Sequence, residues 1–387
     1  MNLNFEIASG TKVIFGRQSI LKLGEECTKL GMNSPMLLTD PGLKSSGAID
    51  IVFESLDKAK INFQLYDKVE ANPSDTSIVD ANHKFIETGC DSFIAAGGGS
   101  TMDTAKAVSV LYANGGKLSD WYGIGNILKS SPPLISIPTT AGTGSEVTNS
   151  SIVTDTKLQI KTTVRNDTMF ANIAIVDSSL LAKLPKELAA GALMDALTHS
   201  IESIGSPKSS PWTEALANKS IELIGRYARK YVDDRSVEES ADAISLAATL
   251  AGRAFGNTGL GIVHSLAHPL GAYHQLHHGT ANGIFLPSVM KFNLPKMKKK
   301  YAEINTLLSN DTNNFKNQSE LERAEDTIRK VDELARDIEI PKTLRELDIT
   351  KKNLDVMSKD AVESNQVKTN PVPATEDDLK KLYEQLL

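Results

Sequence analysis

The histidines of this chain are unevenly distributed. The sequence has 387 residues and seven histidines, and six of these fall between His199 and His278. Asp195 lies four residues before His199, a spacing that places a carboxylate and an imidazole on one face of a helix. Imidazoles from a second segment could complete a four-ligand site for a divalent metal ion. The pattern therefore predicts a metal-dependent enzyme.

The helix expected around Asp195 is apolar on nearly all its faces, which is typical of a buried helix. A buried carboxylate needs a counter-charge, and no lysine or arginine lies between Glu187 and Lys208 to provide one. A divalent cation shared by Asp195 and His199 satisfies this need. The alternative is a hydrogen bond between the two side chains in a core without any metal.

The remaining ligands are expected from a later cluster. His264 and His268 are one helical turn apart, so both could face the same site. Pro269 predicts a kink or a helix end nearby, and a break at Gly271 would bring the next histidines in from a new direction. Four residues therefore compete for the last two positions: His264, His268, His277 and His278.

Adjacent side chains point in different directions, so at most one of His277 and His278 is expected to bind the metal. His83 and His274 are interpreted as surface or packing residues. Aspartate and histidine ligands suit a borderline divalent ion such as Fe(II) or Zn(II). An open coordination position would let the ion polarise the oxygen of a carbonyl or an alkoxide.

The segments around these residues predict two domains. In the first half, apolar runs that favour strands alternate with periodic segments that favour helices, which is typical of a parallel sheet covered by helices. The strands are expected at 36–39, 62–66, 92–96, 134–137, 151–153 and 173–176, and the helices at about 44–60 and 75–88. The result is an N-terminal α/β dinucleotide-binding domain, a Rossmann-like variant, over residues 1–184.

Beyond residue 184 the pattern becomes entirely helical, and no strand is expected after residue 180. Helices are predicted at 186–204, 211–231 and 238–255, with another from His264 and a last one after Thr375. Residues 309–320 are polar and predict a surface loop. The second domain is therefore an all-α, metal-binding domain over residues 185–387.

Two turns of the first domain are rich in hydrogen-bond donors. Gly97-Gly98-Gly99-Ser100 follows a strand and opens a helix, where a close backbone approach and free N–H groups suit a phosphate. A second turn, over residues 137–148, offers threonine hydroxyls as hydrogen-bond donors. The alternative is that the polar groups of both turns only form hydrogen bonds with their own backbone. The usual G-x-G-x-x-G fingerprint is missing, and the acidic candidate Asp40 precedes the glycines. Together the turns favour a nucleotide site of variant architecture.

Composition excludes several classes of protein. The net charge of −6 and the pI near 5.7 argue against nucleic acids or anionic membranes as partners. Cys27 and Cys90 are expected to be free thiols in a reducing compartment. No signal peptide and no apolar run of about 18 residues is visible, so a cytoplasmic location without membrane contact is expected.

Five motifs together resemble the iron-containing (group III) alcohol dehydrogenase family over almost the whole chain. They are GGGS at 97–100, PTTAGTGSEVT at 138–148, DALTHSIES at 195–203, GLGIVHSLAHPLGAYHQLHHG at 259–279 and TNPVPATEDD at 369–378. The resemblance implies NAD as cofactor, a divalent metal that is most simply Fe²⁺ with Zn²⁺ as the alternative, a small alcohol or aldehyde substrate, and a homodimer or higher homo-oligomer.

The same resemblance assigns individual roles. It implies metal ligation by Asp195, His199, His264 and His278, and substrate binding and proton transfer by His268. It implies that Asp40 contacts the adenosine ribose and favours NAD over NADP. The other implied cofactor contacts are Asn72, Gly98, Gly99, Ser100, Thr139, Thr140, Thr143, Lys161 and Leu180. The chain departs from the family pattern at Ser178, at Ala192-Leu193, and at His274 and His277.

Hydride transfer between NAD(H) and a small primary alcohol or its aldehyde is therefore the leading hypothesis. A lyase similar to dehydroquinate synthase, which uses NAD and a metal on the same architecture, is the alternative. That chemistry needs a basic phosphate pocket, and the lysines and arginines of the helical half are scattered. A non-catalytic nucleotide-binding module with a structural metal is a third hypothesis, but it leaves the convergence of several histidines unexplained.

Overall fold

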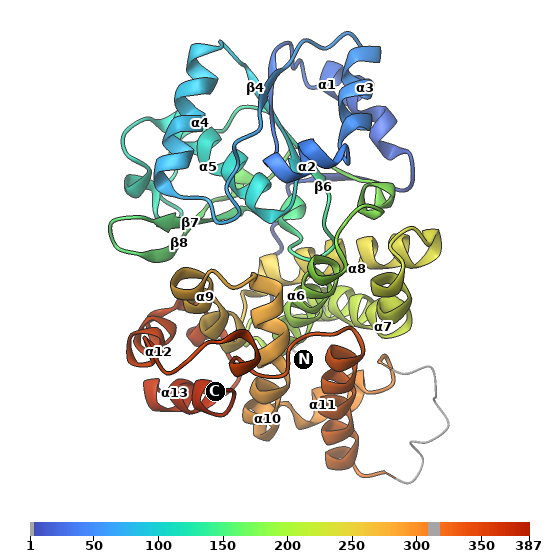
Figure 1. The fold of residues 1–387 in the computed structure, drawn as a ribbon, viewed down its shortest axis with the longest axis vertical. Helices are drawn as coiled ribbons and strands as arrows, with labels where there is room; N and C mark the ends of the chain where they lie inside the picture. Colours follow the sequence, from blue (N-terminus) through green and yellow to red (C-terminus); the bar gives the residue numbers. More distant parts are fainter. Residues whose placement is uncertain (1–3, 309–317) are drawn as a thin grey trace. The chain divides into compact units, whose positions relative to one another are not determined.

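Two structural units make up the part of the chain that the computed structural model describes, residues 4–308 and 318–387. The first unit is Ala8–Lys183, and the second is Leu184–Leu387 together with the described residues before Ala8. Strands and helices alternate in the first unit, whereas the second is built from helices (Figure 1). Most of the residues predicted to do chemistry divide between a sheet edge in the first and a helix cluster in the second.

A six-stranded sheet forms the centre of the first unit. Every neighbouring pair in it is parallel, which confirms the predicted parallel sheet. Four of its strands are buried along their whole length, because helices cover both faces. In spatial order the strands are β1 (Lys12–Phe15), β9 (Ile173–Val176), β6 (Leu134–Pro138), β4 (Ser92–Gly97), β2 (Pro35–Leu38) and β3 (Gln64–Tyr66).

Two separate apolar cores lie against the faces of this sheet. Helices α4 (Asp75–Glu87) and α5 (Gly99–Asn114) contribute to one core, and α1 (Leu23–Lys29) and α3 (Asp50–Lys58) to the other (Figure 1). The single helix predicted at 44–60 is wrong. The segment forms α2 (Pro41–Ser46) and α3, because Gly47 adopts a left-handed conformation with φ of 65° that ends the first helix.

A small second sheet was not predicted. It contains β5 (Gly123–Ile124), β8 (Ile160–Arg165) and β7 (Ser150–Asp155), and β7 and β8 pair as an antiparallel hairpin. Only the middle of β7 was expected to be a strand. The sequence of β8, IKTTVR, is largely polar because the strand is only partly buried, so apolar periodicity gave no signal for it.

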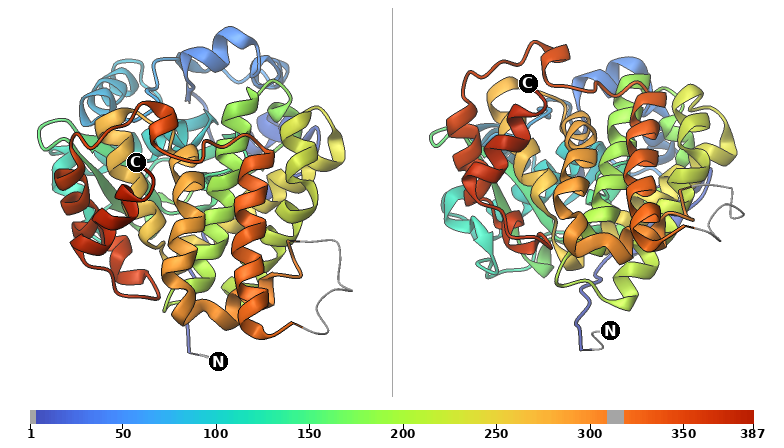
Figure 2. Two further views of the ribbon diagram at one scale, coloured as in Figure 1. Left: turned by 60° about the horizontal axis from the view of Figure 1, so that its bottom comes forward. Right: turned by 90° about the horizontal axis from the view of Figure 1, so that it is seen from below.

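The second unit contains eight α-helices in its described part, and no strand is found there, which confirms the predicted all-helical domain. Helix α6 is buried over most of its length and packs against α7, α8 and α10; α6, α10 and α11 run side by side in Figure 2. The helices are α6 (Lys186–Gly205), α7 (Pro211–Asp233), α8 (Glu238–Thr258), α9 (Ile262–His274), α10 (His278–Ile304), α11 (Glu320–Asp337), α12 (Leu354–Glu363) and α13 (Glu376–Glu384).

The course of α9 differs from the prediction. The helix passes through Pro269 and Gly271 instead of breaking there, and it ends at Gln275, whose φ of 55° is left-handed. A proline inside a helix removes one backbone hydrogen bond but does not always end the helix. Helix α10 then begins at His278. The surface loop predicted at 309–320 falls mostly outside the described residues, since 309–317 are not described.

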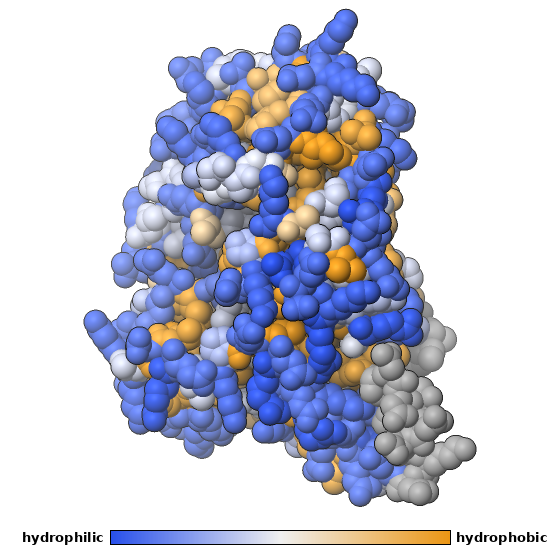
Figure 3. Space-filling view, turned by 45° about the vertical axis from the view of Figure 1, so that its right-hand side comes forward, coloured by the Kyte–Doolittle hydropathy of each residue, from blue (hydrophilic) through white to orange (hydrophobic). Residues whose placement is uncertain are grey.

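The surface is mainly polar where it can be seen. Hydrophilic side chains cover most of the face drawn in Figure 3, with smaller apolar patches between them. Among the described helices, none combines the length and the apolar character that crossing a bilayer requires. Cys27 and Cys90 are buried and free, as the cysteine count predicted.

Candidate active site

Asp195 and His199 form the predicted pair on α6. They lie one turn apart, and both side chains are buried. The Oδ1 atom of Asp195 is 3.3 Å from Nε2 of His199. The ring of His199 stacks on Phe255 of α8, with 4.1 Å between the ring centroids, which holds the imidazole in place. The helix is buried continuously from Ala189 to Ile204, which buries the pair, as the apolar composition of the helix predicted.

Two more imidazoles reach the same carboxylate oxygen from different helices. Nε2 of His264, on α9, is 3.5 Å from Oδ1 of Asp195, and Nε2 of His278, at the start of α10, is 3.6 Å from it. A tetrahedral site with bonds of about 2.1 Å has ligand atoms separated by about 3.4 Å. The separations between Oδ1 and the nitrogens of His199 and His264 are close to this value, and Asp195, His199 and His264 form a group that could hold a divalent ion, while His278 approaches the same oxygen from α10.

An asparagine that the sequence did not single out lies within this cluster. Asn282 of α10 is fully buried, and its Nδ2 donates to Oδ1 of Asp195 at 2.7 Å. The same nitrogen is 3.2 Å from Nε2 of His264 and 3.2 Å from Nε2 of His278. Its Oδ1 has no hydrogen-bond partner among the described residues. A buried amide oxygen without a donor suits a site for a cation.

The charges of the cluster also favour a cation. Burial alone would raise the pKa of the Asp195 carboxyl, but the positive charges of His199 and His278 and a hydrogen bond from His264 hold that pKa well below its usual range. Burial opposes protonation of His264, yet the carboxylates of Glu202 and Asp195 raise its pKa to about 9. Two buried carboxylates that favour protons on the imidazoles would favour a divalent cation in their place.

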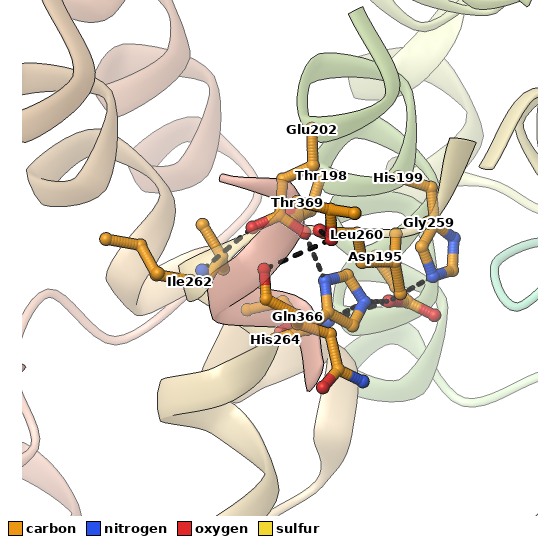
Figure 4. A network of polar contacts seen from close by, with 12 residues as sticks. Asp195, Thr198, His199, Glu202, Gly259, Leu260, Ile262, His264, Gln366 and Thr369 are labelled. Carbon is orange, nitrogen blue, oxygen red and sulfur yellow. Dashed lines mark hydrogen bonds and ion pairs between the residues drawn. The ribbon is translucent and has the colours of Figure 1, made fainter. Parts of the chain in front are cut away.

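Glu202 is the second residue that the sequence did not single out. It is buried on α6, and its Oε2 lies 2.6 Å from Nδ1 of His264 (Figure 4). A signal for it existed in the sequence, because Glu202 follows His199 by three residues and therefore shares its helical face. The cluster thus has an inner group of metal-ligand type and an outer carboxylate behind it.

The other histidines are placed as follows. The ring centroid of His268 is 5.4 Å from that of His278 and 6.1 Å from that of His264, so His268 lies beside the cluster. His277 has its Nδ1 3.3 Å from the Thr280 hydroxyl. His274 ends α9, and partial burial, with the charge of Lys352, lowers its pKa. His83 lies on the exposed side of α4.

The donor-rich turns of the α/β unit meet at one edge of its sheet. Strand order places β3 on one side of β2 and β4 on the other, so the winding reverses between β2 and β4. Asp40 follows β2, and the glycine turn follows β4, whose Gly97 is in register with Pro138 at the end of β6. Ligands of open parallel sheets bind at such a reversal, outside the carboxyl ends of the strands.

The two turns are in close contact. A Cβ atom on Gly99 would lie 2.7 Å from Cγ2 of Thr143, and one on Gly98 would lie 3.5 Å from Cγ2 of Thr140. Helix α5 starts at Gly99 without a side-chain cap, so its first N–H groups are available to an anion. The buried hydroxyl of Thr139 has no partner among the described residues.

The remaining predicted cofactor residues are spread more widely. Lys161 of β8 donates to Oδ1 of Asn72 at 2.8 Å, which joins positions 89 residues apart in the sequence. Ser100 donates its hydroxyl to the carbonyl of Ala71 and so lies beside them. Leu180 is buried in the core on the α1 and α3 side of the sheet. Asp40 caps α2, because its Oδ1 accepts the N–H of Leu43 at 2.9 Å.

A buried lysine holds the second turn on α5. The Nζ atom of Lys106 donates to the carbonyls of Ser145 and Ser150, at 2.6 and 3.0 Å, and to the Ser145 hydroxyl at 2.9 Å. That hydroxyl in turn donates to Oδ1 of Asp103 at 2.7 Å. Burial, only partly offset by the nearby carboxylates, lowers the pKa of Lys106 to about 8. This network fixes the position of the threonine-rich turn relative to the glycine turn.

Two family models cover nearly all of the chain. Residues 10–178 match iron-containing alcohol dehydrogenase, and residues 189–387 match the C-terminal domain of the Fe-containing alcohol dehydrogenase family. The chain therefore belongs to the iron-containing alcohol dehydrogenase family and is an oxidoreductase of that type. This confirms the family that the five motifs indicated.

Individual relatives agree with this assignment. An NAD-dependent methanol dehydrogenase of Bacillus methanolicus is 32% identical over 97% of this chain and 97% of its own length. A 1,3-propanediol dehydrogenase of Citrobacter freundii is 34% identical over 96% of each chain. A crystal structure of a 1,3-propanediol oxidoreductase superposes with a TM-score of 0.96 at 33% identity, covering 99% of this chain and 100% of that one.

Proposed function

We propose that this chain interconverts a small primary alcohol and its aldehyde with NAD(H), using a divalent ion held by Asp195, His199, His264 and His278. The observation that carries the proposal is the placement of three imidazole nitrogens 3.3, 3.5 and 3.6 Å from one carboxylate oxygen. The proposed ligands come from three helices, α6, α9 and α10. His264 and His278 are favoured because their Nε2 atoms face Asp195.

When bound, the ion, Fe²⁺ in this proposal, supplies a Lewis acid for the substrate oxygen. Bound NADH would supply the hydride for the carbonyl carbon of an aldehyde, and the substrate oxygen would then need a proton. His268 lies beside the cluster, so its imidazole donates that proton and takes it back in the reverse reaction. The buried, apolar surroundings of α6 keep bulk water away from Asp195, His199 and His264, whereas the side chain of His278 is partly exposed.

The nucleotide site of the proposal is the sheet edge at the reversal between β2 and β4. Gly98, Gly99 and Ser100 present the N-terminus of α5 to the pyrophosphate. Thr139, Thr140 and Thr143, with Asn72, Lys161 and Leu180, line the rest of the cofactor. Asp40 accepts hydrogen bonds from the adenosine ribose and disfavours a 2′-phosphate, because two negative charges would meet there. Support comes from the contact between the two turns and from the unpartnered Thr139 hydroxyl.

The competing hypotheses lose support. The lyase similar to dehydroquinate synthase is not favoured, because both family models that match are alcohol dehydrogenase models. A non-catalytic module would not require His268 beside a cluster of metal-ligand type.

The quaternary state and the location complete the proposal. A homodimer or higher homo-oligomer is supported by the edge strand β1, which among the described strands pairs with β9 alone and exposes Val13 and Phe15. A cytoplasmic location is supported by the two buried free thiols, Cys27 and Cys90. Light scattering coupled to size-exclusion chromatography tests the first, and cell fractionation tests the second.

The test of the activity is the consumption of NADH with a panel of small aldehydes after loading with Fe²⁺ or Zn²⁺. We expect turnover in the wild type, and both turnover and bound metal should fall toward zero in His278→Ala and Asp195→Ala. His83→Ala, an exposed histidine, is the matched control and should keep both. Full metal occupancy in the His278 and Asp195 variants would contradict the ligand assignment.

A further inference from the structure

Glu202 occupies a distinctive position behind the metal-ligand cluster. It follows Asp195 by seven residues and His199 by three on α6, so all three side chains share one face of the helix. The side chain is buried, with only 6% of the residue exposed. A buried carboxylate is costly unless it is hydrogen-bonded, and Glu202 is hydrogen-bonded through both of its oxygens.

The two oxygens of Glu202 bind two consecutive residues of α9. Oε2 lies 2.6 Å from Nδ1 of His264 (Figure 4), and Oε1 accepts the backbone N–H of Val263 at 2.8 Å. Helix α9 begins after Gly261, which has no side chain to cap it. Glu202 therefore caps the start of α9 from another helix, and a negative charge at this end of a helix is favourable.

A second side chain braces the same helix end. Oδ1 of Asn370 accepts the N–H of Ile262 at 3.3 Å and a hydrogen bond from Asn293 at 3.0 Å. Gly261 lies between the two braces, since a Cβ there would be 2.8 Å from Oε1 of Glu202 and 2.9 Å from Oδ1 of Asn370. The backbone before His264 is thus fixed by two buried groups. Only Glu202 also contacts the imidazole.

The chemistry of a carboxylate decides which ring nitrogen faces the cluster. An ionised carboxylate only accepts hydrogen bonds, so Nδ1 of His264 must carry a proton to bond with it. The lone pair of the other nitrogen, Nε2, is then available on the side of Asp195, 3.5 Å away. Histidine ligands of metal ions are commonly oriented by such a carboxylate, which also makes the ligand nitrogen more basic.

We propose that Glu202 is a positioning residue of the metal centre, which fixes both the ring tautomer and the backbone register of His264. This inference rests on the proposed function, because it takes His264 to be a ligand. Glu202 itself contacts neither the ion nor the substrate. A substitution of Glu202 should therefore lower the affinity for the metal ion more than it lowers the free energy of unfolding.

Glu202→Gln tests the inference with little change of shape. Glutamine offers one acceptor and one NH₂ donor, whereas Val263 and His264 both need an acceptor. Either α9 loses its cap or the NH₂ group faces Nδ1, which moves the ring proton to Nε2 and blocks ligation. We expect metal binding about 10–100-fold weaker in a chelator-competition titration of the full-length chain. Glu187→Gln, an exposed acid on the same helix, is the matched control and should bind metal like the wild type.

Two further measurements separate positioning from packing. Glu202→Asp keeps both carboxylate oxygens as acceptors, although its side chain is one methylene shorter. It should therefore recover part of the metal affinity that Glu202→Gln loses. If it recovers none, the loss of metal affinity comes from altered packing. In the Zn²⁺-loaded wild type with ¹⁵N-labelled histidine, the Nδ1 proton of His264 should be visible by NMR and slow to exchange. An exchange-labile or missing Nδ1 proton would overturn the inference even if Glu202→Gln failed to fold.

The outcomes also distinguish this inference from the proposed function. If His264→Ala loses the metal and Glu202→Gln binds it within about twofold of the wild type, Glu202 is not a positioning residue and the ligand assignment stands. If His264→Ala keeps wild-type metal affinity, the ligand set of the proposed function is wrong.

Discussion

Helix α10 starts against α6 at a contact between two glycines, and the substitution Gly279→Ala tests how tightly this contact holds the site. A Cβ on Gly279 would lie 2.1 Å from the carbonyl oxygen of Gly191 and 2.5 Å from its carbonyl carbon. Both obstacles are backbone atoms of α6, so no side chain can rotate away. The start of α10 must therefore move away from α6, and His278 is the residue immediately before Gly279.

The movement of α10 is larger than the positional tolerance of a metal ligand. Restoring an ordinary contact requires a shift of about 1 Å, because nonbonded atoms approach no closer than about 3–3.5 Å. Metal-ligand distances are held within about 0.2 Å, so a shift of this size would remove His278 from coordination. Overpacking of this kind typically costs about 1–3 kcal/mol of stability, or a fall in Tm of about 2–4 °C per kcal/mol for a unit of this size.

Gly283→Ala is the matched control one turn further along α10. Its new Cβ would lie 3.1 Å from side-chain atoms of Ile340 and Met194, which can yield by a few tenths of an ångström. Gly283→Ala gains helix propensity of about 1 kcal/mol, whereas Gly279, in the first turn of α10, is not in the helix interior to which this gain applies. We expect Gly283→Ala to keep metal affinity and stability near the wild type, and Gly279→Ala to lose both. Thermal unfolding in chelator and a metal titration measure the two effects; wild-type metal affinity in Gly279→Ala would refute the reasoning.

Substitutions at three other positions have defined outcomes. His268→Ala should keep its metal, lose most turnover and flatten the pH–rate profile near neutrality; loss of metal would instead make His268 a ligand. Asp40→Gly should raise kcat/KM for NADPH far more than it changes kcat/KM for NADH. Asp40→Ser, which keeps the cap of α2, should do the same. If the ratio of the two kcat/KM values is unchanged in both variants, Asp40 acts only as the helix cap. Burial lowers the folded-state pKa of Lys106 from its ordinary value of 10.5 to about 8, so the unfolded chain binds more protons between these values. The free energy of unfolding should therefore rise with pH, by about 2 kcal/mol between pH 7.5 and 10 relative to Lys106→Met. Urea titrations of both proteins at pH 7.5 and 10 measure this difference, and parallel pH dependences would contradict it.

The fold was predictable wherever burial is continuous. The strands β2, β4, β6 and β9 are apolar runs, α6 is apolar on nearly all its faces, and α7 and α8 have clear periodicity, so all were expected near their observed bounds. The polar strand β8 carries no such pattern and was missed, and so was the edge strand β1, which is only four residues long although three of them are apolar. Helix α9 was wrongly ended at Gly271, because tertiary packing outweighs the local effect of Pro269.

The site was predictable to the extent that its residues are neighbours on one element. The pair of Asp195 and His199 follows from helical spacing alone. The choice of His264 and His278 depends on where α9 ends and α10 begins, which only the folded chain shows. Asn282 was missed because a single amide in a helix is indistinguishable from any other polar residue until the helices are packed.

The ligand cluster also resembles a chemical cross-link. Asp195 and His278 are separated by 82 intervening residues, and they lie on helices that meet only in the folded state. An ion shared by α6, α9 and α10 would close this loop much as a disulfide does, and a ligand that binds only the folded chain adds about 4 kcal/mol of stability at 1,000 times its Kd. The supply of metal would then set the lifetime of the protein as well as its activity. Without the metal ion, the chain would unfold locally at α9 and α10 first. A protease could then cleave these helices, so that the protein would be degraded as well as inactive.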